Sequence, residues 1–143
     1  MDHIAIMNAR RKLIDKIVQG EKTIESRRYQ TKRAPRDRIQ PWDMIYFKDA
    51  GKPVTAQANV SKVLQFEDLD KEKISEIANN YAKGIGMSNE TISSRWSKKK
   101  YCILVFLEDP HYITPFQINK QWFGNAAARL CIDNIKSIRN NFF

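Results

Sequence analysis

The stretch that most constrains the fold is VTAQANVSKVLQF, residues 54–66. Val54, Ala56, Ala58 and Val60 occupy every second position, which is the period of a β-strand with one buried face. Val63 does not continue this alternation, and such a break is typical of a β-bulge. The sequence therefore predicts one long strand here, and with it a fold built on a sheet.

Other segments show strand or helix patterns. Residues 22–29 alternate like a strand, and YCILVFLE at 101–108 is apolar enough for the centre of a sheet. Strands separated by inserted helices, with few parallel crossovers, predict the α+β class, as a small mixed β-barrel of five to six strands with flanking helices. The remaining expected elements are strands at 42–49 and 112–116, helices at 8–19 and 67–83, and a strand or short helix at 130–138.

Length and charge narrow the class of protein. The 143 residues fit a single domain, residues 1–143. The net charge of +9 favours polyanionic partners, with nucleic acid first and anionic membranes second. No apolar run approaches the roughly 20 residues of a membrane span, and the N-terminus lacks the pattern of a signal peptide. We therefore expect a cytoplasmic protein that does not bind membranes.

The cysteines and histidines do not form a metal-binding pattern. Cys102 and Cys131 lie in apolar settings and far apart, and neither pairs with His3 or His111 at ligand spacing. We interpret the cysteines as reduced thiols of the core. The sequence predicts neither a metal nor a cofactor.

The stretch GEKTIESRRYQTKRAPRDR, residues 20–38, concentrates positive charge. Seven Lys or Arg residues oppose three acidic ones, so its net charge is 7 − 3 = +4. Glu25 and Arg27 share one face of the expected strand. Lys22 can approach Glu25 only if it lies in the turn that enters the strand, because residues three apart face opposite ways on a straight strand. The stretch is either a solvated surface or a site for an anion.

The segment G-E-K-T-I-E-S-R at 20–27 resembles the G-x-K-x-x-E-x-R signature of the ASCH domains, which belong to the PUA-like superfamily. The helix before it, the basic loop after it and the strand after Trp42-Asp43 also match, although relatives often have Gly-Asp at that point. The resemblance is strongest over residues 8–108. It implies a closed β-barrel with a charged cleft beside the signature, and work related to RNA.

Within that family, the resemblance leaves the chemistry open. One branch removes the acetyl group from 4-acetylcytidine, and another member has been described as a ribonuclease. The deacetylating branch has a threonine where this chain has Glu25. Glu25 therefore either acts directly in the cleft or forms an ion pair that shapes it. Lys22 either contacts the ligand or acts as a nucleophile or base, which would require a lowered pKa.

Two tryptophans lie beside basic residues, and we interpret them differently. Trp96, in SRWSKKK, is expected to stack on a base, whereas Trp42 is expected to close the mouth of the barrel. The candidate catalytic residues, if the protein is an enzyme, are Lys22 and Glu25. The candidate nucleic-acid-binding residues are Lys22, Glu25, Arg27, Arg28, Tyr29, Lys32, Arg33, Arg36, Arg38, Arg95 and Trp96.

These observations predict an ASCH domain that holds RNA, single-stranded nucleic acid or a modified nucleotide in a basic cleft. One alternative is an enzyme that acts on RNA or a modified nucleoside, either an amidohydrolase on 4-acetylcytidine or a ribonuclease. A second alternative is a protein-interaction adaptor whose basic charge serves only solubility.

Overall fold

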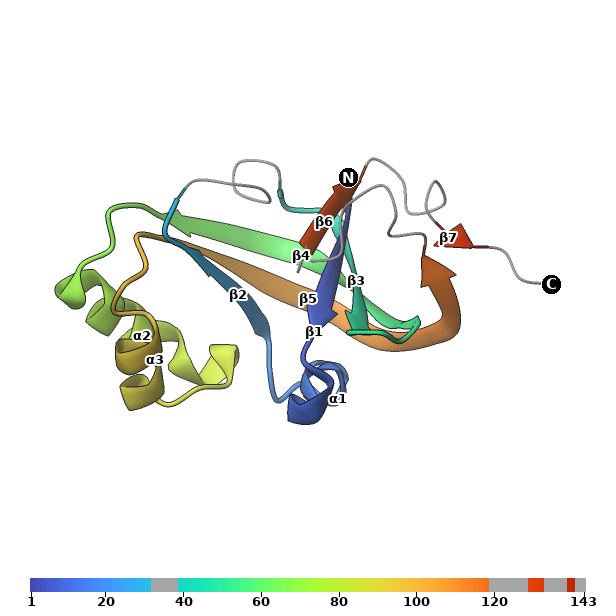
Figure 1. The fold of residues 1–143 in the computed structure, drawn as a ribbon, viewed down its shortest axis with the longest axis horizontal. Helices are drawn as coiled ribbons and strands as arrows, with labels where there is room; N and C mark the ends of the chain where they lie inside the picture. The colour runs from blue at the N-terminus through green and yellow to red at the C-terminus, as the bar shows by residue number, and fades with distance from the viewer. Residues whose placement is uncertain (32–38, 119–128, 133–138, 141–143) are drawn as a thin grey trace.

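The computed structural model describes residues 1–31, 39–118, 129–132 and 139–140 (Figure 1). Within these ranges the strands are β1 (Asp2–Met7), β2 (Ile24–Tyr29), β3 (Met44–Asp49), β4 (Val54–Phe66), β5 (Tyr101–Ile118), β6 (Arg129–Ile132) and β7 (Arg139–Asn140). The helices are the 3₁₀ turn η1 (Ala9–Arg11), α1 (Leu13–Val18), α2 (Lys71–Ile85) and α3 (Asn89–Arg95).

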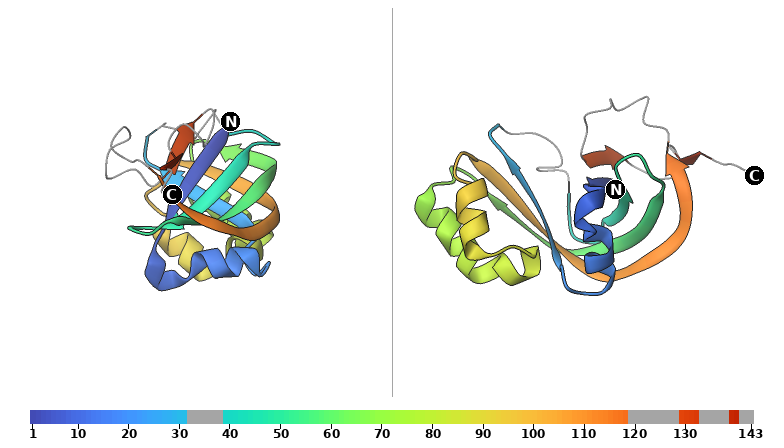
Figure 2. Two further views of the ribbon diagram at one scale, coloured as in Figure 1. Left: turned by 90° about the vertical axis from the view of Figure 1, so that its right-hand side faces the viewer. Right: turned by 60° about the horizontal axis from the view of Figure 1, so that its bottom comes forward.

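The strands form one mixed sheet in the order β2-β5-β4-β3-β1-β6, and β7 pairs with β5. β1 and β3 are parallel, and the other pairs are antiparallel. The expected α+β class and mixed sheet are confirmed. Over the described ranges, however, the hydrogen-bonded order begins at β2 and ends at β6, so the sheet is strongly curved but not closed (Figures 1 and 2).

Bulges explain the curvature of the two longest strands. The register between β4 and β5 shifts at three places, between Val54 and Ala56, between Gln57 and Asn59, and between Val60 and Lys62. The last shift lies beside the break in parity that the sequence shows at Val63. Because each bulge bends and twists its strand, β5 continues through the two segments expected at 101–108 and 112–116 as a single strand.

The expected helix at 8–19 is divided. The Asn8 side chain caps the 3₁₀ turn by accepting a hydrogen bond from the backbone N–H of Arg10. Lys12 then adopts a left-handed conformation with φ of 52°, and α1 begins only at Leu13. The prediction of one continuous helix is wrong because the left-handed residue interrupts it and changes the direction of the chain.

The sheet is covered by different helices at different places. Ile14 and Ile17 of α1 pack with apolar residues of β1, β3, β4 and β5. α2 and α3 pack together at the other end of the sheet, against β2 and β5 (Figure 1). α2 begins at Lys71 rather than Glu67, because the Asp70 side chain accepts a hydrogen bond from the backbone N–H of Lys73 and caps the helix there.

Beyond the helix expected at 67–83, residues 84–100 contain the end of α2 and the whole of α3. Ser88 caps α3 through a hydrogen bond from the backbone N–H of Thr91. Cys102 is a free, buried thiol in the core beneath these helices, and burial raises its pKa to about 12. None of the described helices has the length and apolar character needed to cross a membrane.

Candidate functional site

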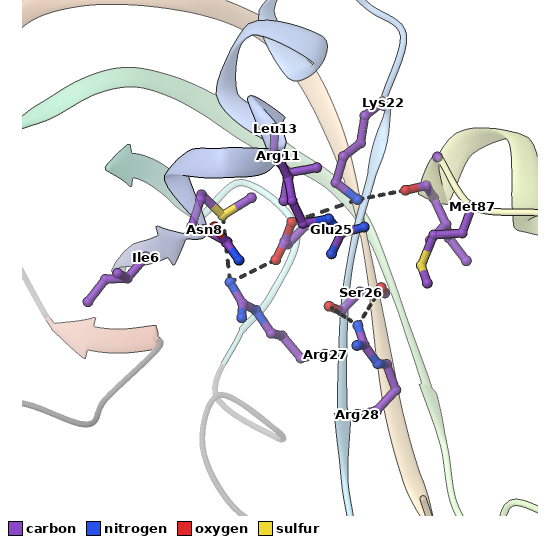
Figure 3. Close-up of a pocket in the computed structure, with 13 residues that line it drawn as sticks. Ile6, Asn8, Arg11, Leu13, Lys22, Glu25, Ser26, Arg27, Arg28 and Met87 are labelled. Carbon is purple, nitrogen blue, oxygen red and sulfur yellow. Dashed lines mark hydrogen bonds and ion pairs between the residues drawn. The ribbon is translucent and has the colours of Figure 1, made fainter. Parts of the chain in front are cut away.

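A pocket of about 270 Å³ opens where the end of β1, the turn η1, the start of β2 and the end of α2 meet (Figure 3). Segments far apart in the sequence therefore build one site around the signature. Its lining residues are Ile6, Met7, Asn8, Arg11, Leu13, Lys22, Glu25, Ser26, Arg27, Arg28, Ile85, Gly86 and Met87.

Lys22 is buried at this pocket, with 6% of its surface exposed. It precedes β2, in the entering turn that its approach to Glu25 requires. Its Nζ donates hydrogen bonds to the carbonyl oxygens of Ile24 at 2.7 Å and Ile85 at 2.8 Å. Lys22 therefore ties the start of β2 to the end of α2.

The charge of Lys22 is subject to opposing effects. Burial lowers its pKa most strongly, while Glu25, whose Oε2 lies 3.9 Å from Nζ, raises it. The positive charges of Arg27 and Arg28 lower it further. The net result is a pKa below the ordinary lysine value.

Glu25 links the two cations beside it. Its Oε1 lies 2.9 Å from Nη2 of Arg27, and its side chain is almost completely buried. Glu25 and Arg27, which share one face of the strand, thus form an ion pair in the structure. We call the three side chains the Lys22–Glu25–Arg27 cluster. Glu25 holds the cluster together, because its removal would leave two neighbouring cations without a counter-charge.

Arg27 and Arg28 each carry a buried donor that lacks a partner among the described residues. Arg28 donates from Nη1 to the carbonyl oxygen and the hydroxyl of Ser26, both at 3.1 Å, and lies 5.3 Å from the centre of the Trp96 ring. The Nε atoms of both arginines are buried without a hydrogen-bond partner among the described residues. Buried donors of this kind need an acceptor, and both side chains line the pocket.

The pocket is electropositive. Arg11, Lys22, Arg27 and Arg28 contribute four cationic side chains against the single carboxylate of Glu25. Arg11 was not among the site residues predicted from the sequence. On an unbroken helix it would have no special position, but the break at Lys12 places it, exposed, at this pocket.

Two residues predicted to contact nucleic acid are instead buried in the core. Trp96 is 0% exposed and packs with Ile92, Cys102 and Leu104. Tyr29, the last residue of β2, is 8% exposed and packs into a different cluster of the core from the one that contains Trp96. Neither ring presents a face to solvent, so these two assignments are corrected. Trp96 acts on the site through Arg28, which it supports.

The other predicted contacts do not lie in the pocket. Arg95 is exposed at the end of α3 and is not among the lining residues. Lys32, Arg33, Arg36 and Arg38 lie outside the described residues. Trp42, expected to close the barrel, is 91% exposed. That expectation is wrong because Trp42 sits in a turn that carries its side chain away from the core.

Gly84 allows α2 to pack closely against the signature segment. The backbone N–H of Thr23 donates to the Gly84 carbonyl oxygen at 2.9 Å. A Cβ on Gly84 would lie only 2.7 Å from Cδ1 of Ile24 and 2.9 Å from Oγ1 of Thr23, so a larger residue would force these side chains or α2 to shift. The glycine thus keeps the carbonyl of Ile85 within reach of Lys22.

Across the part of the chain that the structure describes, no group of three or more His, Cys, Asp or Glu residues could hold a metal ion. The charged groups at the pocket are cationic except for Glu25, a set that suits anions rather than metals.

The fold and the pocket together define an α+β domain with a curved mixed sheet and a basic site beside an edge strand. The sequence matches the family model of the ASCH domain over residues 7–127. The chain belongs to the ASCH domain family.

Solved structures support the shared fold. An ASCH protein from Zymomonas mobilis is 14% identical, with a TM-score of 0.69 over 97% of this chain and 96% of that one. Its tyrosine-to-phenylalanine mutant is 15% identical, with a TM-score of 0.70 over 95% and 93%. At such identities the likeness concerns the fold alone. A search of curated proteins gave no match.

Proposed function

We propose that this ASCH domain binds single-stranded RNA and holds one of its nucleotides in the pocket beside the signature. The observation that carries the proposal is the Lys22–Glu25–Arg27 cluster, with Lys22 and Glu25 buried, in an electropositive pocket. A cluster fixed by ion pairs and backbone hydrogen bonds is preorganised, so a ligand pays little for ordering the side chains that recognise it.

The chemistry of the pocket favours a ligand rich in acceptors. The Glu25 carboxylate is already paired with Arg27, whereas the guanidinium-bearing side chains of Arg27 and Arg28 line the pocket. Phosphate oxygens and the carbonyl edges of bases supply such acceptors. The volume of about 270 Å³ lies just below the range of about 300–1,000 Å³ for small-molecule sites, which suits one nucleotide rather than a duplex.

Affinity for single-stranded RNA is expected to fall as salt rises. If Z phosphates are neutralised on binding, log K should fall with log salt with a slope of about −0.7Z. Fluorescence anisotropy across a salt series, with single-stranded RNA, double-stranded RNA and DNA in parallel, measures this slope. A flat response, or no binding at low salt, would contradict the proposal and favour the adaptor alternative.

A second candidate, an enzyme on a modified nucleoside or on RNA, is favoured by the lowered pKa of Lys22. A neutral Lys22 amine can donate its two N–H groups to the carbonyls of Ile24 and Ile85 and keep its lone pair for a proton. In amide hydrolysis, Lys22 would take a proton from the attacking water, and Glu25 would pass it to the nitrogen that leaves.

If this second candidate is correct, the protein should convert 4-acetylcytidine to cytidine and acetate, or shorten RNA. Mass spectrometry after incubation with each substrate detects either product. Lys22→Met should abolish the conversion, whereas Lys98→Met, an exposed residue after α3, should not affect it. If both substrates remain intact after long incubation with folded protein, the enzyme candidate is wrong and only the binding function remains proposed.

A further inference from the structure

Trp42 combines two properties that rarely occur together. Its side chain is 91% exposed, the most of the large hydrophobic residues that the structure describes, and its backbone is left-handed with φ of 77°. Glycine adopts this conformation at no steric cost, whereas a bulky aromatic residue does so only under strain. The exposed indole gains little burial in return. Strain of this kind, held by its surroundings, points to a function.

The turn that carries Trp42 is firmly held. The backbone N–H of Trp42 donates to the Val60 carbonyl at 2.8 Å, and the N–H of Val60 donates to the Asp43 carbonyl at 2.9 Å. The Asp43 side chain accepts from the backbone N–H of Gln40 at 2.9 Å and lies 2.9 Å from Nε2 of buried His3. The turn therefore presents the indole to solvent from a fixed base.

The charge of Asp43 supports this arrangement. Burial raises the pKa of its carboxyl, but the hydrogen bonds with His3 and Gln40 outweigh burial and hold the pKa below its usual range. The carboxylate therefore remains ionised at neutral pH and continues to fix the turn.

The turn and the pocket lie at opposite ends of the same strand. Asp2 of β1 pairs with Met44, next to the turn, whereas Met7 at the other end of β1 lines the pocket. In Figure 1 the beginning of β1 is at the top of the molecule and α1, beside the pocket, is at the bottom. The steps from Asp2 to Met7, at about 3.3 Å each, separate the two ends of β1 by roughly 17 Å.

We propose that Trp42 is a second contact for the same single-stranded RNA, on which a base several nucleotides from the pocket stacks. This inference rests on the proposed function. A flat aromatic surface on a protein of net charge +9 is the combination that single-strand binders use. In the sequence, the residues between β2 and the turn add Lys32, Arg33, Arg36 and Arg38, so the chain that joins the two sites is itself basic.

The test compares Trp42→Gly, Trp42→Phe and the control Tyr112→Ala, which removes an exposed aromatic ring outside the pocket lining. Affinity is measured for a uridine mononucleotide and for a single-stranded RNA of about ten nucleotides, a length within the site sizes of single-strand binders. Trp42→Gly should weaken binding of the longer RNA between about fivefold and a hundredfold and leave mononucleotide binding unchanged. Trp42→Phe should keep most of the affinity, and Tyr112→Ala all of it.

Stability separates stacking from a structural role. Because glycine relieves the left-handed strain and no packing is lost, Trp42→Gly should unfold at the same temperature as the wild-type protein or higher. Equal affinity of Trp42→Gly and wild type for the longer RNA overturns the inference while the proposed function stands. If Trp42→Gly instead abolishes self-association seen by light scattering, with RNA affinity unchanged, Trp42 is a protein contact and the inference is wrong. Failure of the wild-type protein to bind any RNA overturns the proposed function itself.

Discussion

Replacing Glu25 with alanine should lower the free energy of unfolding by about 3–5 kcal/mol, the usual cost of leaving a buried charge without its partner. Glu25 is 3% exposed, and its carboxylate lies against Arg27 and within 3.9 Å of the Lys22 amine. Arg27 is partly exposed and can turn toward solvent, but Lys22 is held by two backbone carbonyls and remains buried. Chemical denaturation monitored by circular dichroism measures the change.

The loss in Glu25→Ala should depend on pH. Glu25 raises the pKa of Lys22 against the effect of burial, so its removal lowers that pKa further. Between this lowered value and the ordinary lysine pKa of 10.5, the unfolded chain binds more protons than the folded one, and stability then rises with pH. The variant should therefore recover part of its stability as the pH is raised toward 10.5.

The matched control is Glu21→Ala, which removes an exposed carboxylate from the same stretch. It should change stability by no more than about 0.5 kcal/mol and show no recovery at high pH. Glu25→Gln, which keeps the shape and one acceptor, should lie between the two. A loss in Glu25→Ala as small as that in Glu21→Ala would mean that the cluster does not hold the pocket together.

The local geometry of the site could be predicted from the sequence because it depends on the strand period. Residues two apart on a strand share a face, so the pairing of Glu25 with Arg27 follows from their spacing. The position of Lys22 in the entering turn follows from the same rule, as the condition for its approach to Glu25. The ASCH family was also identified from this segment and its order relative to the later strands.

The burial of one tryptophan and the exposure of the other could not be predicted from the sequence, because both lie beside basic residues in turn-rich segments. Trp96 is buried by Cys102 and Leu104 of β5 and by Ile74 and Ile77 of α2, contacts that local sequence does not show. Trp42 is exposed and its backbone is left-handed, a conformation that residue type alone argues against. The predicted roles are therefore reversed: long-range packing buries Trp96, which was expected to be free to stack, and a strained turn carries Trp42, which was expected to be covered.

The arrangement of the sheet also depended on contacts distant in sequence. β1 was not predicted as a strand, yet it pairs in parallel with β3 and in antiparallel with β6. Its end supplies Met7 to the pocket, and the turn that follows supplies Arg11. Five of the thirteen lining residues, those from Ile6 to Leu13, therefore come from a segment whose role appears only when residues some 40 positions apart pair.

Arg27→Ala is expected to abolish discrimination among nucleotides and to weaken RNA binding by about ten- to a hundredfold, because a hydrogen bond to a charged group contributes about 1.5–3 kcal/mol. Arg27 is fixed by Glu25 at 2.9 Å, and its Nε has no partner in the described part of the chain. Its guanidinium is therefore held in one orientation at the pocket, and a fixed orientation is what selection among ligands requires. Titrations with short RNAs that differ in one base, at two salt concentrations, measure affinity and selectivity together.

Arg95→Ala provides the comparison, since Arg95 carries the same charge but is exposed on α3, outside the pocket lining. A residue that contributes only charge should weaken binding similarly for every sequence and reduce the salt slope by about one contact. Arg27→Lys keeps the charge but loses the planar array of donors, so it should recover the salt slope without the selectivity. If Arg27→Ala and Arg95→Ala, both shown to be folded by circular dichroism, lose the same affinity and no selectivity, the pocket does not recognise a nucleotide, and the arginines of this chain form only a diffuse basic surface.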